Sequence, residues 1–277
     1  MSSVVKWYGY IVFLIILCQG AYHTSAETYQ PSFVFVGDSN TASVQWKNGS
    51  FVVKLPELGN PWDQLNITNS GHDGWGAFSY FQQPEVIMQN ILNYNPDFIL
   101  VALGGNDFLH FQNAVQFQAS YHYLISGLEN ISASCDITQV YLANIYWGSL
   151  SLPDYEVQRY EDFQQIINNT AAEYNLPLLD FFSVTENHTE YYLKDNIHLN
   201  EQGHWAIAEA INQQIGSDVS TKSKNLSSGS RVCTWPDVVS SSSSLSTSNK
   251  SKSDLLVEPL ILGLVFLLSY RRQEDTN

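Results

Sequence analysis

The chain has 277 residues, enough for one domain with appended segments, and 44% of them are hydrophobic, which is sufficient for a core. Its formal net charge is −15 at pH 7, and residues 27–218 carry 22 acidic side chains against 4 Lys and Arg, a net charge of −18. Such an acidic surface repels polyanions, so nucleic-acid binding is excluded and a neutral substrate is expected.

The N-terminal segment, residues 1–26, has the features of a secretory signal peptide. Lys6 precedes the apolar run 11–17, and small residues follow near Gly20 and Ala26. The apolar run is too short to favour a membrane anchor, which needs about 20 apolar residues. We therefore expect the protein to enter the secretory pathway and to act at the cell surface or outside the cell.

Short apolar runs then alternate with amphipathic segments. β-branched and aromatic runs that end at turn residues predict strands at 33–36, 67–70, 98–103, 139–145 and 176–181. Apolar residues at helical spacing predict helices at 84–94, 113–128, 155–174 and 201–215. The third strand is apolar on both faces, as in a parallel sheet covered on both sides. The alternation predicts a doubly wound α/β sandwich around a five-stranded parallel sheet.

The composition changes after Asp218. The Ser-rich segment that follows has almost no large apolar side chains, so it cannot offset its ordering entropy and should be a disordered stalk. The apolar run 255–270 precedes Arg271 and Arg272, a pattern typical of a membrane span, although a GPI signal is the alternative. The expected organisation is a signal peptide at 1–26, a folded domain at 27–218, a stalk at 219–254, a hydrophobic anchor at 255–270 and a polar tail at 271–277.

Seven N-x-S/T sequons behind a signal peptide predict a glycosylated surface. They begin at Asn48, Asn66, Asn130, Asn168, Asn187, Asn225 and Asn249. Removal of the signal peptide would leave Cys135 and Cys233, an even pair in an oxidising compartment. These two cysteines either form a disulfide or remain separate thiols, because the sequence gives no distance between them.

Polar motifs follow the predicted strands. Ser39 lies in the turn after the first strand, within Gly-Asp-Ser-Asn, and Asn106 follows the third strand within Gly-Gly-Asn-Asp. Asp195 precedes His198 by three positions, so its carboxylate can orient the imidazole that would take the Ser39 proton, as in a hydrolytic triad. Taken singly, each motif is also explained as a helix cap or an ordinary turn. The ends of parallel strands meet at one sheet edge, where such folds bind ligands.

Together and in this order, the motifs resemble those of the SGNH (GDSL-type) hydrolase family. In that family's second block an Asn precedes a Gly by about five positions; Asn69 and Gly74 match, and Gly71 fits a looser alignment. Asn40 departs from the Leu that the family often carries. The resemblance covers residues 32–215 and implies a flavodoxin-like, three-layer α/β/α fold. It implies Ser39 as nucleophile, His198 as base, Asp195 as its orienting carboxylate, and Ser39, Gly74 and Asn106 as oxyanion-hole donors.

The resemblance implies a serine esterase that hydrolyses acetyl, short-chain or lipid acyl esters through an acyl-enzyme intermediate, without a cofactor. The alternatives are an acyltransferase that moves an acyl group to a glycan, and a non-enzymatic surface recognition protein on the same fold. His72 and Asp73 have no third ligand at suitable spacing, so no metal site is expected. The sequence does not identify the substrate-binding residues. We expect a monomer whose partners are a neutral glycan or lipid ester and, through the C-terminal anchor, the membrane.

Overall fold

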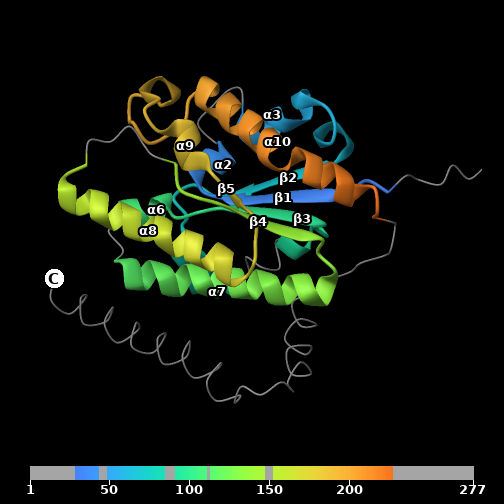
Figure 1. Ribbon diagram of the computed structural model, residues 1–277, viewed down its shortest axis with the longest axis horizontal. Helices are drawn as coiled ribbons and strands as arrows, with labels where there is room; N and C mark the ends of the chain where they lie inside the picture. The colour runs from blue at the N-terminus through green and yellow to red at the C-terminus, as the bar shows by residue number, and fades with distance from the viewer. Residues whose placement is uncertain (1–28, 44–48, 85–90, 111–112, 147–151, 227–277) are drawn as a thin grey trace, which may run out of the picture.

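The computed structural model describes residues 29–43, 49–84, 91–110, 113–146 and 152–226 (Figure 1). The predicted signal peptide, anchor and tail lie outside these residues, and so do most of the stalk and the sequons at Asn48 and Asn249. Within the described part, no helix is both long and apolar enough to span a bilayer.

Five strands form one parallel sheet, as predicted. They are β1 (Ser32–Gly37), β2 (Asn66–Gly71), β3 (Phe98–Ala102), β4 (Gln139–Ala143) and β5 (Leu178–Leu179). Their order, β2-β1-β3-β4-β5, is the flavodoxin-like order. Strand β5 is shorter than the predicted 176–181, because the Asp180 side chain already caps the next helix by accepting the backbone N–H of Ser183.

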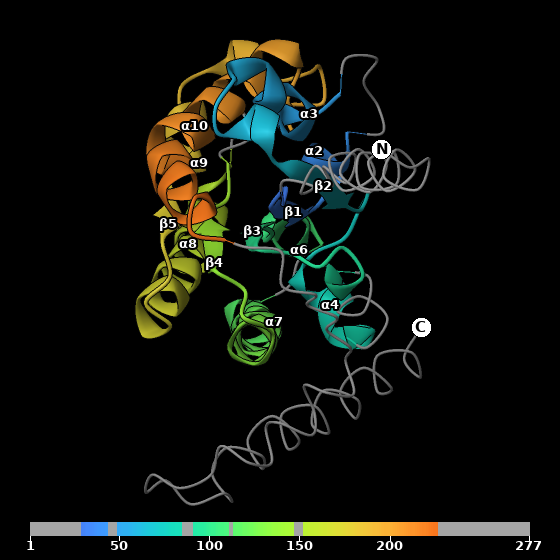
Figure 2. The same ribbon diagram turned by 90° about the vertical axis from the view of Figure 1, so that its right-hand side faces the viewer.

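Helices cover both faces of this sheet and confirm the three-layer sandwich (Figures 1 and 2). On one face lie α4 (Ala77–Gln82), α7 (Ala114–Cys135) and α8 (Asp154–Glu173), and on the other lie α3 (Phe51–Lys54), α9 (Phe181–Thr185) and α10 (Glu201–Ser223). The short elements are α2 (Ser39–Ala42), α6 (Gly105–Leu109), η1 (Leu55–Leu58), η2 (Trp62–Gln64) and η3 (Thr189–Tyr191). Of the predicted helix 84–94, Pro84, Ile91 and Leu92 are helical, and residues 85–90 lie outside the described part.

The two faces of β1 show how the alternating pattern builds the core. Phe33 and Phe35 point to the α10 side, where their rings stack with centroids 4.6 Å apart. Val34 and Val36 point to the α7 side. All four side chains are fully buried. Successive strand residues face opposite sides, so a strand buried on both faces must be continuously apolar. Polar chemistry is thereby confined to the strand ends.

Helix α10 continues to Ser223, beyond the predicted helix end and beyond the predicted domain boundary at Asp218. The reason lies in its last turns, where Val219 is fully buried. Lys222 Nζ donates to Asp218 Oδ2 at 2.9 Å and to Gln139 Oε1 at 2.6 Å. The folded domain therefore includes the first residues that composition assigns to the stalk.

Two predictions about covalent modification involve described residues. Cys135 is disulfide-bonded, but Cys18 and Cys233 lie outside the described part, so pairing with Cys233 stays a prediction. The described sequons begin at exposed residues, as glycosylation requires, and these are Asn66, Asn130, Asn168, Asn187 and Asn225.

Candidate active site

Ser39 lies where β1 turns into α2, at the carboxyl edge of the sheet. The turn is tight: a Cβ added to Gly37 would lie 2.0 Å from Thr41 Oγ1 and 3.1 Å from the Ala102 carbonyl oxygen. Asp38 caps the helix, because its Oδ1 accepts the Asn40 backbone N–H at 2.9 Å. Asp38 therefore does cap a helix, as the alternative explanation of this motif predicted. The same turn also directs the Ser39 side chain toward a partner residue.

That partner is His198, 159 positions away. Ser39 Oγ lies 2.9 Å from His198 Nε2, and His198 Nδ1 lies 2.7 Å from Asp195 Oδ2. The other carboxylate oxygen, Asp195 Oδ1, accepts the backbone N–H groups of Ile197 and His198, each at 3.0 Å. The structure thus brings the three predicted catalytic side chains into one hydrogen-bonded chain.

The carboxylate of Asp195 is held in its charged form. Partial desolvation alone would raise the pKa of Asp195, but the hydrogen bonds from the His198 ring and the two backbone amides outweigh it and lower this pKa. An ionised Asp195 can fix the tautomer of His198 and stabilise an imidazolium.

Asn40 has a structural function that the sequence did not reveal. Its Oδ1 accepts the Leu199 backbone N–H at 2.8 Å, and its Nδ2 donates to the Ile197 carbonyl oxygen at 3.5 Å. The side chain is 5% exposed. Asn40 therefore ties the segment that carries Ser39 to the segment that carries His198. The only sequence signal was an amide at a position where the family often has Leu.

Asn106 is positioned by α6 at the same sheet edge. Gly104 precedes this helix with φ of +127°, and an added Cβ would approach Ile145 Cδ1 to 2.8 Å, so the turn requires glycine. Asn106 Nδ2 donates to the Trp75 carbonyl oxygen at 3.0 Å. A primary amide carries two N–H groups. The second can point toward the cavity that Asn106 lines together with Ser39.

The loop that carries Gly74 is docked onto α6 by Asp107. This carboxylate accepts the backbone N–H groups of Ala77 at 2.8 Å and Phe78 at 3.0 Å, and the residue is 1% exposed. Burial raises the pKa of Asp107, and the two N–H donors oppose that rise. A Cβ on Gly76 would lie 2.3 Å from Asp107 Oδ2, so the loop packs this closely only with glycine. Asp107 is a positioning residue that motif matching alone did not identify.

Gly74 fits an oxyanion-hole donor better than Gly71. Gly74 has φ of +73°, is exposed, and has open space where a Cβ would stand. The Gly71 N–H already donates to Asn69 Oδ1 at 3.0 Å, and a Cβ there would lie 2.3 Å from the Ala42 backbone nitrogen. Gly71 is therefore required for packing. Asn69 in turn donates to the Thr41 carbonyl oxygen at 2.6 Å, which fixes β2 beside α2.

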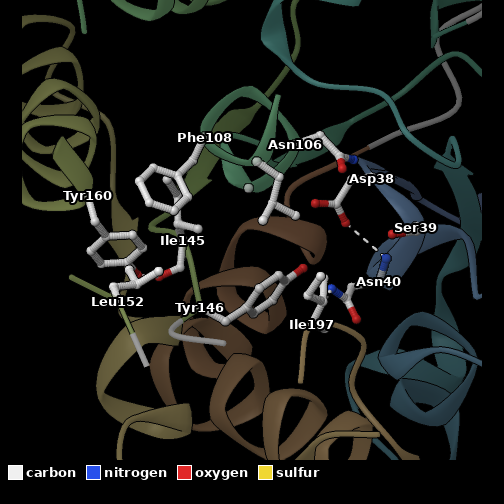
Figure 3. Close-up of a pocket in the computed structure, with 12 residues that line it drawn as sticks. Asp38, Ser39, Asn40, Asn106, Phe108, Ile145, Tyr146, Leu152, Tyr160 and Ile197 are labelled. Atoms are coloured by element: carbon white, nitrogen blue, oxygen red, sulfur yellow. Dashed lines mark hydrogen bonds between the residues drawn. The ribbon is translucent and has the colours of Figure 1, made fainter. Parts of the chain in front are cut away.

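A cavity of about 50 Å³ opens beside Ser39 (Figure 3). Its polar end holds Asp38, Ser39 and Asn106, and its apolar walls are Phe108, Leu109, Ile145, Leu152 and Tyr160. Burial raises the pKa of Asp38 to about 6, although the Asn40 N–H and the nearby His198 oppose the rise. A buried carboxylate that is protonated only at mildly acidic pH thus adjoins the proposed nucleophile.

Other titratable residues serve the fold. His204 is 1% exposed, and its Nδ1 accepts the Phe51 backbone N–H at 3.3 Å. Burial, with smaller effects of Lys54 and His198, lowers the pKa of His204 to about 4. Across the described ranges, no three His, Cys, Asp or Glu side chains lie together as a metal-ligand set.

Comparison with known proteins places these observations in a family. The model of the GDSL-like lipase/acylhydrolase family matches residues 35–206. Thioesterase 1/protease 1/lysophospholipase L1 of Escherichia coli (strain K12) is 24% identical over 222 residues, which cover 77% of this chain and 94% of that protein. An acetylxylan esterase from Geobacillus stearothermophilus matches with a TM-score of 0.55 and 18% identity, covering 67% of this chain and 94% of that one. An α/β hydrolase from the metagenome of Lake Arreo, Spain, matches with a TM-score of 0.56 and 18% identity, covering 68% and 97%.

Proposed function

This chain belongs to the GDSL-like lipase/acylhydrolase family and is an SGNH-type serine hydrolase of carboxylic esters, and from this premise we propose that it acts through an acyl-enzyme formed on Ser39. Ser39 Oγ attacks the ester carbonyl carbon while His198 Nε2 accepts the hydroxyl proton. The protonated His198 then gives this proton to the departing alcohol. Water, deprotonated by His198, attacks the acyl-enzyme, releases the acid and restores Ser39.

The observation that carries this proposal is the unbroken chain from Ser39 Oγ to His198 to Asp195, with separations of 2.9 and 2.7 Å. The order of contacts matches the three functions: nucleophile, base and orienting carboxylate. Both distances allow direct hydrogen bonds, so proton transfer needs no rearrangement of the side chains.

The oxyanion of the tetrahedral intermediate is stabilised by the backbone N–H groups of Ser39 and Gly74 and by the Asn106 amide. Support comes from the position of Asn106 on the Ser39 cavity and from the bond between Asn106 and the Trp75 carbonyl. That bond links two of the proposed donors, because Trp75 directly follows Gly74 in the chain.

Water access favours hydrolysis over acyl transfer. The side chain of His198 is 21% exposed and that of Asp195 is 41% exposed, so solvent reaches the base. A transferase must keep water from its acyl-enzyme, and among the described residues no such shield stands over these two side chains. A purely recognising protein would not need a complete hydrogen-bonded triad.

The names of the relatives, which include a lysophospholipase and an acetylxylan esterase, leave both lipid and glycan esters open as substrates.

The decisive experiment compares ester hydrolysis by Ser39→Ala and His198→Ala with the wild type. Each variant should lose at least about 10³-fold in kcat while keeping its fold, because the triad acts as a unit. A fluorophosphonate probe should label the wild type and fail to label Ser39→Ala. The matched controls are Ser217→Ala on the exposed side of α10 and His122→Ala on α7, and both should keep full activity. A folded Ser39→Ala protein with undiminished turnover would refute the proposal.

We also propose that the enzyme is a glycoprotein of the secretory pathway, tethered to the membrane by residues 255–270. Support comes from the signal-like N-terminus, the basic pair after the apolar run, and the exposed positions of the described sequons. An epitope tag after Asn277 tests the tether: a span retains the tag on membrane-bound protein. A GPI anchor loses it and is released by phosphatidylinositol-specific phospholipase. Fully soluble secretion would contradict both.

A further inference from the structure

The cavity beside Ser39 has a polar end and an apolar end. Ser39, Asp38 and Asn106 lie at the polar end, and Leu152 and Tyr160 lie on the opposite side of the cavity (Figure 3). A chain that starts at a carbonyl carbon bonded to Ser39 Oγ would therefore run along apolar walls toward these two side chains. This is the environment that an aliphatic group requires.

The position of His198 indicates which half of an ester the cavity receives. The leaving alcohol must lie beside His198 Nε2, because that nitrogen gives it a proton. The described residues that line the cavity include Ile197, the neighbour of His198 in the sequence, but they do not include His198 itself. Asn106, a proposed oxyanion donor, is part of it. The cavity is thus adjacent to the carbonyl and away from the leaving group, as an acyl-binding site must be.

The size of the cavity limits the acyl group. Its volume of about 50 Å³ is roughly a third of the ~150 Å³ in which an apolar cavity holds one benzene ring. By this scale it holds about two or three carbon atoms beyond the carbonyl carbon. Acetyl, propionyl and butyryl groups fit, whereas the chain of a long fatty acid does not.

The walls are braced, so the cavity does not enlarge easily. The guanidinium of Arg159 lies 4.0 Å from the centroid of the Phe108 ring, and its Nη1 donates to the Phe108 carbonyl oxygen at 2.9 Å. On the other wall, the Tyr160 hydroxyl donates to the Ile145 carbonyl oxygen at 2.7 Å, and Gln164 Oε1 accepts the Ile145 N–H at 3.1 Å. Displacing either wall to admit a longer chain would break these contacts.

We propose that this cavity is the acyl-binding site and that it restricts the enzyme to esters of two- to four-carbon acids. The inference rests on the proposed function of Ser39 as nucleophile, and it names the substrate class of that site. We assign the length limit to Leu152, because it lies on the side of the cavity opposite Ser39 (Figure 3) and is only partly buried.

The test measures kcat/KM of the full-length protein on p-nitrophenyl acetate, butyrate, hexanoate and octanoate. The expected profile is highest at acetate or butyrate and lower by at least about tenfold at octanoate, because each excess methylene must displace packed side chains. Leu152→Ala should move the optimum toward hexanoate. Leu152→Phe should reduce butyrate hydrolysis by at least about tenfold and preserve acetate hydrolysis.

Leu58→Ala is the matched control. Leu58 is also a partly buried leucine, but it packs against the α10 side of the sheet, so its truncation should leave the chain-length profile unchanged. Folding of every variant is verified by thermal unfolding, and the number of active sites by fluorophosphonate labelling.

Three results would overturn the inference while leaving the esterase proposal intact. They are equal rates on acetate and octanoate, an optimum that does not respond to either Leu152 variant, and Leu152 variants that alter rates along a series of methyl, butyl and octyl acetates. The last result would mean that the cavity receives the alcohol. A wild-type protein that hydrolyses no ester at all would instead refute the proposed function itself.

Discussion

At the scale of single residues, the site depends on carboxylates that do no chemistry themselves. Asp107 is the clearest case. It holds the loop after Gly74 against α6 by accepting two backbone N–H groups, one on each carboxylate oxygen. An amide in its place has only one oxygen and would direct its own NH₂ group at the second backbone N–H. The Gly74 loop and helix α6, which carry the proposed oxyanion donors, would then shift relative to each other.

We therefore expect Asp107→Asn to lower kcat on p-nitrophenyl acetate by about 10- to 100-fold, with a much smaller change in KM. Loss of one oxyanion-hole donor lowers kcat by about 10²- to 10³-fold, and a misaligned donor should have a similar but weaker effect. Steady-state kinetics of Asp107→Asn, Asn106→Ala and the double variant measure this. The double variant should lose less than the product of the two single effects, because the bond from Asn106 to the Trp75 carbonyl oxygen couples the two proposed donors.

Strict additivity of these two substitutions, or a change confined to KM, would show that Asp107 has no function in the oxyanion hole. A loss of activity that merely follows a loss of folded protein, seen by thermal unfolding at the assay temperature, would reduce Asp107 to a stabilising contact.

Asp38 gives a prediction about stability and pH. Its carboxyl group is 4% exposed, and its pKa rises from the ordinary 3.8 to about 6 in the folded protein. The folded state therefore binds this proton more tightly than the unfolded state does, so stability is lost as pH rises from about 4 to about 6. A shift of this size corresponds to about 3 kcal/mol at most.

Asp38→Asn should abolish this dependence, because the amide stays neutral and its oxygen can still accept the Asn40 N–H. Relative to the wild type, the variant's free energy of unfolding should increase by up to about 3 kcal/mol between pH 4 and pH 8. Urea denaturation of both proteins at the two pH values measures the difference. If the gap between the two proteins is the same at both pH values, Asp38 does not titrate in this range.

At the scale of elements, the end of α10 is the part of the fold that most needs its own test. Val219 is fully buried, whereas Val53 on α3 is 52% exposed. Val219→Ala should lower the free energy of unfolding by about 2 kcal/mol, since it removes two buried methyl groups and leaves a cavity. Val53→Ala, the matched control, should change it by less than about 0.5 kcal/mol. Urea denaturation of the two variants measures both values. Equal effects would mean that α10 ends before Val219.

The helices and strands also show which parts of the fold could be predicted from the sequence. Strands β1 and β3 were predictable because a strand buried on both faces is continuously apolar, whereas β2, with the sequence NITNSG and a partly exposed surface, gave a much weaker signal. The proximity of Ser39 and Asn106 was predictable, since strand ends of a parallel sheet meet at one edge. His198 lies in the loop before α10, and only the resemblance to the family's motif indicated that it faces Ser39. The end of α10 was not predictable from its Ser-rich composition. The helix continues because Val219 is buried by tertiary contacts, which the local sequence does not show.

Other features depend on contacts that no local pattern encodes. Asn40 acts through Leu199, 159 positions away, and Asp107 acts through Ala77 and Phe78, about 30 positions away. In the sequence, each of the two resembles an ordinary turn or capping residue. The cavity beside Ser39 is formed where the β1–α2 turn, α6, the end of β4 and the start of α8 meet, so its volume depends on packing between elements that are far apart in the sequence.

At the scale of the whole molecule, the excess of acidic over basic side chains is the feature that should most affect which substrates reach the site. Several of the few cations are occupied by internal contacts. Lys54 is 3% exposed, lies 3.7 Å from Glu201 and stands over the Trp205 ring. Arg159 stacks on Phe108. The folded part of the chain thus keeps its large excess of carboxylates, and the described residues that line the cavity beside Ser39 include no Lys or Arg.

This field should discriminate between substrates by their charge. An acetyl ester whose alcohol part carries a sulfonate should approach the site more slowly than a neutral acetyl ester, because long-range repulsion lowers the encounter rate. Salt screens this repulsion, since the Debye length falls from about 30 Å at 0.01 M to about 3 Å at 1 M. We therefore expect kcat/KM for the sulfonated ester to rise several-fold between about 0.01 and 0.5 M NaCl, while the neutral ester changes by less than about twofold.

An ester with a quaternary ammonium on the alcohol is the complementary control, and its kcat/KM should fall over the same range. The charge is placed on the alcohol so that the acetyl group still fits the cavity beside Ser39. Identical salt responses of all three esters would mean that the site is shielded from the field of the surface, and the net charge would then carry no information about the natural substrate.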